Sequence, residues 1–112
     1  MTDLAANQLD RFVRTVAHTR RQISKHFFDS LHLPAAPCLD ILFALHVSDG
    51  VPLDMDSLSE YISSSSSITV RYLNLMGGKG LVEVDDGNVR ITPDGTRELL
   101  NILSQYREDF DQ

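Results

Sequence analysis

The chain is poor in the residues that stabilise secreted and membrane proteins. Its 112 residues include one cysteine, Cys38, and no tryptophan, so an intramolecular disulfide is excluded and a reducing, cytoplasmic location is expected. The sequence shows no secretory signal, and no apolar run approaches the roughly 18 residues that a membrane-spanning helix needs. We therefore expect a cytoplasmic protein with no membrane span.

Residues arranged for catalysis or metal binding are also scarce. The four histidines, at positions 18, 26, 32 and 46, lack the i, i+4 spacing of helical zinc sites. The sequence GGKG at residues 77–80 resembles a phosphate-binding loop in composition, but it follows an expected helix and opens an expected strand, the reverse of the order in such loops. The serine run at residues 63–67 has no nucleophile-elbow pattern around it. The sequence thus predicts no enzyme, no cofactor and no metal site.

Acidic side chains outnumber basic ones. The formal net charge is -6 and the sequence pI is about 4.9, which argues against a general binder of polyanions. The longest acid-free stretch contains residues 62–82, with Arg71 and Lys79 inside it. Such a stretch fits a surface that faces phosphates, although a serine-rich turn beside a buried helix would also lack acids.

Two helices are expected around the serine run. The first spans about residues 55–62, with Leu58, Tyr61 and Ile62 on one face. A serine hydroxyl can accept a hydrogen bond from an unpaired amide in the first turn, so a second helix can begin within the run and reach about residue 76. The glycines of GGKG would end it, because glycine adopts the left-handed conformation without steric cost. The inward residues of this second helix would be Thr69, Tyr72, Leu73 and Met76.

The residues that follow predict a β-hairpin. Two alternating runs, residues 81–85 and 88–92, are joined by Asp86-Gly87, and Asp-Gly between such runs is a strong hairpin signal. Together, residues 55–92 predict a helix-turn-helix followed by a two-stranded wing. That arrangement indicates a nucleic-acid reader rather than an enzyme.

The segment KGLVEVDDGNVRITPDGTRELL, residues 79–100, resembles the end of the winged-helix domain of MarR-type transcriptional regulators. In that family the recognition helix runs into a Lys-Gly-Leu-Val strand, followed by a wing with an arginine and by Leu/Ile-Thr-x-x-Gly at the start of the closing helix. Arg90 and the sequence ITPDG at residues 91–95 match the last two features. The resemblance covers about residues 38–103. It implies a mainly α fold with a small β-hairpin wing, a winged helix-turn-helix with long N- and C-terminal dimerisation helices.

Apolar residues at helical spacing mark both ends of the chain. Length and composition predict one domain, residues 1–112. The resemblance implies that helices at 1–33 and 96–112 mediate dimerisation and flank a winged helix-turn-helix at 38–95. A homodimer would place two recognition helices over palindromic half-sites about 34–36 Å apart. The alternative is that the terminal helices fold back on their own domain. The apolar residues concerned are Leu9, Phe12, Val13, Val16, Ile23, Phe27, Leu31, Leu99, Ile102, Leu103, Tyr106 and Phe110.

The expected contacts with double-stranded DNA gather on the second helix and the wing. That helix would enter the major groove, where Arg71 and Asn74 would reach base edges or phosphates. Alternatively, Arg71 pairs with Glu60 or Asp56, Arg90 pairs with Asp85, and Asn74 faces only solvent. The candidate DNA-binding residues are Ser65, Ser66, Ser67, Thr69, Val70, Arg71, Asn74, Lys79, Asn88 and Arg90.

The resemblance also implies a small-molecule effector, held between the dimerisation helices and the winged domain. Phe27, Phe28, Leu31 and Phe43 are candidate lining residues, but aromatic residues at helical spacing are more often part of a core. Cys38 is expected at the start of a helix, where it is either a small buried residue or a redox-sensitive thiol.

A competing interpretation is a winged helix used for protein contact, without DNA binding. Ile68, Val70 and Leu75 fall on the outer part of the second helix, and Asp85 and Asp86 make the tip of the wing acidic. An apolar patch with an acidic rim is typical of a partner-binding surface. The two interpretations differ in whether Arg71 or Val70 carries the interaction.

Overall fold

Helix α2 (Ala35–Val47) forms the centre of the fold in this computed structural model, which describes the backbone of residues 3–110 and the side chains of residues 5–104. The sequence of α2 is apolar on nearly every side, so other elements can surround it. Its buried residues are Cys38, Ile41, Leu42, Ala44 and Leu45. The remaining elements complete the core around it with Leu58, Leu73, Met76, Val89, Leu99 and Ile102.

Cys38 is one of these core residues and has no exposed surface. Burial raises the pKa of its thiol to about 12, because the charged thiolate would lose its hydration. A thiol that stays protonated is a poor nucleophile and a poor target for oxidants. The buried interpretation of Cys38 is therefore confirmed, and the redox-sensing interpretation loses its basis.

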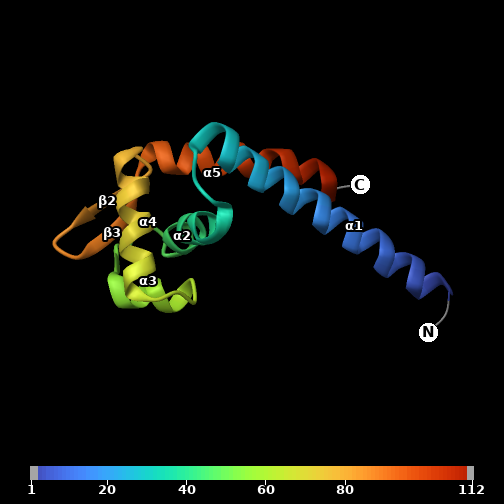
Figure 1. The fold of residues 1–112 in the computed structure, drawn as a ribbon, viewed down its shortest axis with the longest axis horizontal. Helices are drawn as coiled ribbons and strands as arrows, with labels where there is room; N and C mark the ends of the chain where they lie inside the picture. Colours follow the sequence, from blue (N-terminus) through green and yellow to red (C-terminus); the bar gives the residue numbers. More distant parts are fainter. Residues whose placement is uncertain (1–2, 111–112) are drawn as a thin grey trace.

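The helices and strands follow one another in the order of a winged helix (Figure 1). A long first helix, α1 (Asp3–His26), continues into the π-helical turn η1 (Phe27–Leu31), and α2 follows. The winged part comprises β1 (Leu53–Asp54), α3 (Met55–Tyr61), α4 (Ser66–Gly78), β2 (Val82–Asp85) and β3 (Asn88–Ile91), and the chain closes with α5 (Pro93–Phe110). The expected mainly α fold with a small wing is confirmed.

Helices α3 and α4 form the expected helix-turn-helix, and a side chain caps each of them. The Asp54 carboxylate accepts a 2.7 Å hydrogen bond from the amide of Ser57, and this bond lowers the pKa of Asp54. The Ser65 hydroxyl accepts a 3.3 Å hydrogen bond from the amide of Ile68 at the start of α4. The serine run thus begins the second helix, as its sequence predicts.

Helix α4 is longer than the sequence predicts. Gly77 and Gly78 lie inside it rather than ending it, since glycine tolerates helical backbone angles at modest cost. The left-handed residue that follows the helix is Gly80, at φ 75°. A Cβ atom on Gly77 would lie 3.8 Å from the carbonyl oxygen of Val82. One edge of α4 therefore faces β2.

The wing is a three-stranded antiparallel sheet with the strand order β1-β3-β2. The short strand β1 pairs Leu53 with Val89 and was not predicted, because two residues are too few to show an alternating pattern. The hairpin itself is confirmed. Asp86 (φ 51°) and Gly87 (φ 79°) are both left-handed, as a two-residue type I′ turn requires.

The Ile-Thr-x-x-Gly sequence has a physical role at the start of α5. The Thr92 hydroxyl donates a 2.6 Å hydrogen bond to the carbonyl of Gly80 and accepts a 2.9 Å bond from the amide of Gly95. Thr92 therefore caps α5 and connects the start of that helix to Gly80, just after α4. A Cβ atom on Gly95 would overlap the carbonyl oxygen of Leu81 and lie 2.8 Å from Ile91 Cγ1, so this close approach requires glycine.

Helix α1 extends well beyond the other helices and strands (Figure 1). The whole molecule, including α1, is 55 Å long in its longest direction. The C-terminal part of α1 packs along α5, where His26 Nε2 lies 2.6 Å from Glu98 Oε1. Near its N-terminal end, Leu9, Phe12 and Val13 are 53%, 61% and 54% exposed. This half of α1 does not fold back on its own domain. The side chains of Tyr106 and Phe110, at the end of α5, lie outside the described residues.

Candidate nucleic-acid interface

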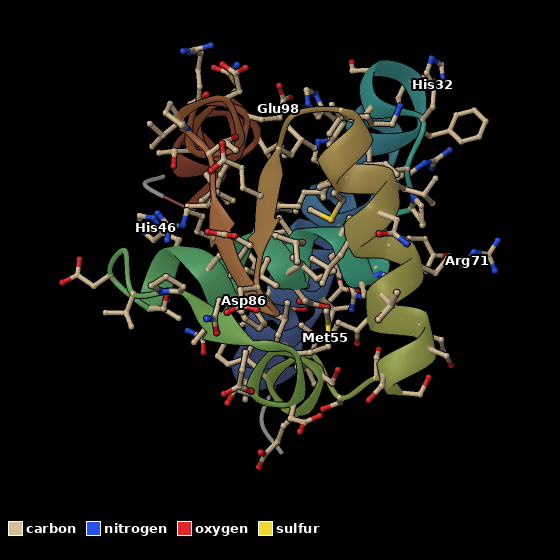
Figure 2. The ribbon with its side chains drawn as sticks, turned by 90° about the vertical axis from the view of Figure 1, so that its left-hand side faces the viewer. His32, His46, Met55, Arg71, Asp86 and Glu98 are labelled. Atoms are coloured by element: carbon tan, nitrogen blue, oxygen red, sulfur yellow. The ribbon has the colours of Figure 1, made fainter. Side chains whose placement is uncertain are left out.

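The outer face of α4 is formed by three exposed polar side chains. Ser67, Arg71 and Asn74 recur at helical spacing, opposite the face that packs into the core. Arg71 projects from α4 into solvent (Figure 2). Its guanidinium carbon lies 5.7 Å from the centre of the Tyr72 ring, a cation–π contact that keeps the charge close to the helix. The face therefore presents one cation between two neutral hydrogen-bonding groups.

The N-terminal turn of α4 is rich in hydroxyl groups, but they are not all accessible. Ser65, Ser66 and Ser67 are exposed, and Ser65 Oγ lies 3.2 Å from Ser67 Oγ. Thr69 is fully buried. Its hydroxyl accepts a hydrogen bond from Ser59 Oγ and donates one to the carbonyl of Ser65, each 2.9 Å long. The prediction that Thr69 contacts phosphate is therefore wrong, because its only hydroxyl is used inside the helix-turn-helix.

The other predicted cations, Lys79 at the end of α4 and Arg90 on β3, are exposed. None of the ion pairs among the described side chains involves Arg71, Lys79 or Arg90. The expected rival pairs of Arg71 with an acid of α3, and of Arg90 with Asp85, are thus not formed. All three cations are free to meet an anion.

Strand register explains the position of the remaining candidates on the wing. Arg90 lies opposite Glu83, and Asn88 lies opposite Asp85, next to the turn. All four side chains are exposed. With Asp86, which Figure 2 shows on the hairpin, they make the outer surface of the wing predominantly acidic. A phosphate backbone would be repelled by most of this surface, and Arg90 is the one cation on it.

Helix α4 also exposes apolar side chains beside its polar face. Ile68, Val70 and Leu75 are 44%, 40% and 45% exposed. Val70 is seven residues before Gly77, two helical turns along the same edge, and therefore lies on the side of α4 that faces the wing. Ile68 and Leu75 are likewise two turns apart and follow the opposite edge. The polar face of this helix is thus flanked by apolar side chains along both of its edges.

A cavity of about 760 Å³ opens where η1 turns into α2. Most of its wall is apolar, with Arg20 and His32 as basic groups and Asp40 as an acid. Its lining residues are Arg20, Ile23, Ser24, Phe28, His32, Leu33, Pro34, Ala35, Ala36, Leu39 and Asp40.

Sequence reasoning identified only one of these lining residues. Phe28 borders the cavity. Phe27 is instead buried in the core, and Leu31 and Phe43 pack against the core. The cavity depends on a tight turn at His32, which is left-handed at φ 54°. Helical periodicity gives no signal for such a turn, although the prolines that follow it mark a break in the helix.

The described residues contain neither a metal-binding cluster nor a single helix that could span a membrane. No group of three histidine, cysteine or carboxylate side chains within them converges in a way that could hold a metal ion. No single helix of this part is long and apolar enough to cross a membrane. Only the segment from Ala5 to Leu31 together with Ala35–Val47, bent by 93°, reaches the required length and apolar content as a pair.

Comparison with known proteins gives matches among solved structures only. No protein-family model and no curated protein matches the sequence. The chain is similar to a MarR family transcriptional regulator from Silicibacter pomeroyi, with a TM-score of 0.64 and 26% identity over 88% of this chain and 68% of that one. It is also similar to a MarR family protein from Bacillus stearothermophilus (TM-score 0.61, 20% identity, 97% and 79% of the two chains). A third similar structure is AbsC, a MarR family transcriptional regulator from Streptomyces coelicolor (TM-score 0.63, 18% identity, 97% and 77%).

Proposed function

The chain is a winged-helix protein of the MarR type, and on this premise we propose that it is a sequence-specific, DNA-binding transcriptional regulator. It acts in the cytoplasm as a homodimer and binds a palindromic operator. Helix α4 enters the major groove, and Asn88 and Arg90 of the wing lie next to the adjoining backbone. The MarR family regulators among its structural neighbours support the general class, and the residues of α4 support the mode of contact.

The observation that carries this proposal is the exposed, unpaired Arg71 on the outer face of α4. Ser67 and Asn74 flank it along the helix, and the segment around it contains no acid. Arginine and asparagine are the side chains that most often make paired hydrogen bonds with guanine and adenine edges. In this proposal Arg71 and Asn74 contact bases or nearby phosphates.

The remaining candidates position the helix on the DNA backbone. Ser66 and Ser67, with the cap residue Ser65, lie at the N-terminus of α4, where hydroxyl and amide donors suit phosphate. Lys79 and Arg90 add positive charge, and Asn88 adds an amide next to the turn of the wing. Thr69 supports this surface from inside the domain instead of contacting DNA.

The exposed apolar stripe of α1 supports the proposal of a homodimer. Leu9, Phe12 and Val13 expose large apolar surfaces on a helix half that has no neighbouring element among the described residues. A protein gains stability when such a stripe is buried against an identical one. A symmetric pair would also present two copies of α4, with half-sites about one helical turn, or 34–36 Å, apart.

The cavity between η1 and α2 supports the proposal of a small-molecule effector. Its volume of about 760 Å³ lies within the range of ligand pockets, and its walls are mainly apolar. It lies at the junction of the long first helix and the winged part. A ligand bound there would bias the orientation of α1 relative to α2, and thereby the separation of the two recognition helices.

The proposal is tested by retention of random genomic DNA fragments on the purified protein at low salt, followed by sequencing. Arg71→Ala is the test variant, and Arg97→Ala, which removes an exposed arginine from α5, is the matched control. We expect enrichment of an inverted repeat by the wild type and by Arg97→Ala, and its loss in Arg71→Ala. Failure of all three proteins to enrich any DNA would contradict the proposal.

A second candidate function is supported by the exposed Ile68, Val70 and Leu75 beside an acidic wing. In that case α4 and the wing bind a protein with a basic, partly apolar surface, and DNA is irrelevant. Val70→Asp would then abolish capture of the partner protein. Arg71→Ala would not change the retention of DNA, because the wild type would retain none.

A further inference from the structure

Two exposed apolar side chains lie in the part of α4 where base contacts are expected. In helix-turn-helix proteins the N-terminal half of the recognition helix reaches the bases. Ile68 and Val70 lie in that half and are 44% and 40% exposed. Their positions are unusual for a helix that only contacts phosphate and base edges through hydrogen bonds.

The two residues lie on either side of Arg71. Ile68 is three residues before Arg71 and lies on the same side of the helix. It is displaced toward the edge that also carries Leu75. Val70 immediately precedes Arg71 and lies on the edge that faces the wing, one turn before Asn74. The side chain of Arg71 is therefore bracketed by apolar groups along both edges of the outer face.

The major groove offers one apolar group for such residues. Every base edge there presents hydrogen-bond donors or acceptors, and only thymine adds a methyl group, at C5. A polar base atom pressed against isoleucine or valine would lose water without gaining a partner, at a cost in binding free energy. A thymine methyl would instead be buried favourably.

From this complementarity we propose that Ile68 and Val70 contact thymine methyl groups on the two sides of the base pair that Arg71 reaches. The inference rests on the DNA-binding function proposed above and adds a feature of the sequence that is bound: each half-site contains thymines flanking that base pair. Leu75, although equally exposed, lies in the C-terminal half of α4 and makes no such contact.

The test replaces thymidine by deoxyuridine in the operator obtained by selection, one position of the half-site at a time. This change removes only the methyl group and leaves base pairing and the hydrogen-bonding edges intact. Affinity is measured by fluorescence anisotropy for the wild type, Ile68→Ala, Val70→Ala and Leu75→Ala. Circular dichroism checks that each variant is folded, as expected for changes at partly exposed positions.

We expect two positions per half-site at which loss of the methyl group weakens binding by the wild type about fourfold. Val70→Ala should be insensitive to one of these changes and Ile68→Ala to the other, while Leu75→Ala responds like the wild type. The inference is overturned if no thymine methyl matters, or if all four proteins respond equally, since the methyl would then act through the shape of the duplex. Failure to select any operator would count against the proposed function itself, and the inference would fall with it.

Discussion

Ser59 Oγ donates a 2.9 Å hydrogen bond to Thr69 Oγ1 in the interior of the helix-turn-helix, and the two residues come from α3 and α4. Thr69 passes the connection on by donating to the carbonyl of Ser65, which precedes α4. Both side chains are buried, so neither hydroxyl can exchange its partner for bulk water. This short chain of hydrogen bonds fixes the angle at which α4 leaves the turn.

Replacing Thr69 by valine should destabilise the protein, because it preserves the shape of the side chain and removes the acceptor of Ser59. We expect a loss of about 1–3 kcal/mol in the free energy of unfolding, measured by urea denaturation. Ser59→Ala should cost less, and the double variant should cost less than the sum of the two, since both partners are then removed. Strictly additive costs would show that the two hydroxyls are not coupled.

Gly95 and Gly78 provide a matched pair of glycine substitutions. Gly95→Ala would drive a methyl group into the carbonyl of Leu81 and against Ile91, and should lower the free energy of unfolding by about 1–3 kcal/mol or more. Gly78 is helical with open space around it, so Gly78→Ala should be neutral or stabilising by up to about 1 kcal/mol. Equal effects on the thermal midpoint of unfolding would contradict this assignment.

The fold was predictable from the sequence where a residue type restricts the backbone conformation or caps a helix. Asp86-Gly87 specified the hairpin because both positions require left-handed backbone, and the serine run specified the start of α4 through its cap. Gly77 and Gly78 were wrongly expected to end α4, because a glycine can end a helix but need not, and the left-handed residue after the helix is Gly80. Strand β1 was missed because its pairing with β3 is made between distant parts of the chain.

Cys38 should be unreactive in the folded protein. Its pKa, raised to about 12 by burial, leaves almost no thiolate at pH 8, so labelling by iodoacetamide should be slow until urea exposes the residue. Because the folded state holds this proton more tightly, the contribution of Cys38 to stability is complete below about pH 9 and declines as the pH rises toward 12. Cys38→Ala should lack this component of the decline. Rapid labelling without denaturant would contradict the prediction.

The candidate site was predictable as a set of exposed positions, less so as a set of contacts. Arg71 and Asn74 follow from helical spacing and the serines from their role as caps, and the structure leaves all of them exposed. Thr69 was correctly predicted to point inward, but it was wrong as a phosphate contact, because its buried hydroxyl accepts a hydrogen bond from Ser59 and donates one to the carbonyl of Ser65. The lining residues of the cavity were mostly not predicted, because the cavity depends on the left-handed turn at His32.

Phe12→Glu should convert a dimer to a monomer. The substitution places a charge in the middle of the apolar stripe on α1, which we propose to be buried against a second copy. The molar mass, measured by light scattering after size-exclusion chromatography, should fall by half at micromolar concentration. Val51→Glu is the control, because Val51 is 63% exposed in the loop after α2 and should leave the assembly unchanged. A monomeric wild type, or a Phe12→Glu variant that remains dimeric, would contradict the pairing of α1.

DNA binding should be of modest affinity and strongly salt-sensitive, with a slope limited by the few cations of the proposed interface. Arg71, Lys79 and Arg90 are its only basic residues, and two copies that each neutralise one phosphate per cation would give a slope of log K against log salt no steeper than about -5. Arg90→Ala should reduce the magnitude of that slope by about 2, one phosphate in each half-site, if the wing reaches the backbone despite its acidic residues. An unchanged slope would place the wing away from DNA. A slope much steeper than about -5 would require cations from elsewhere in the chain, and the exposed arginines of α1 would then be the first to replace.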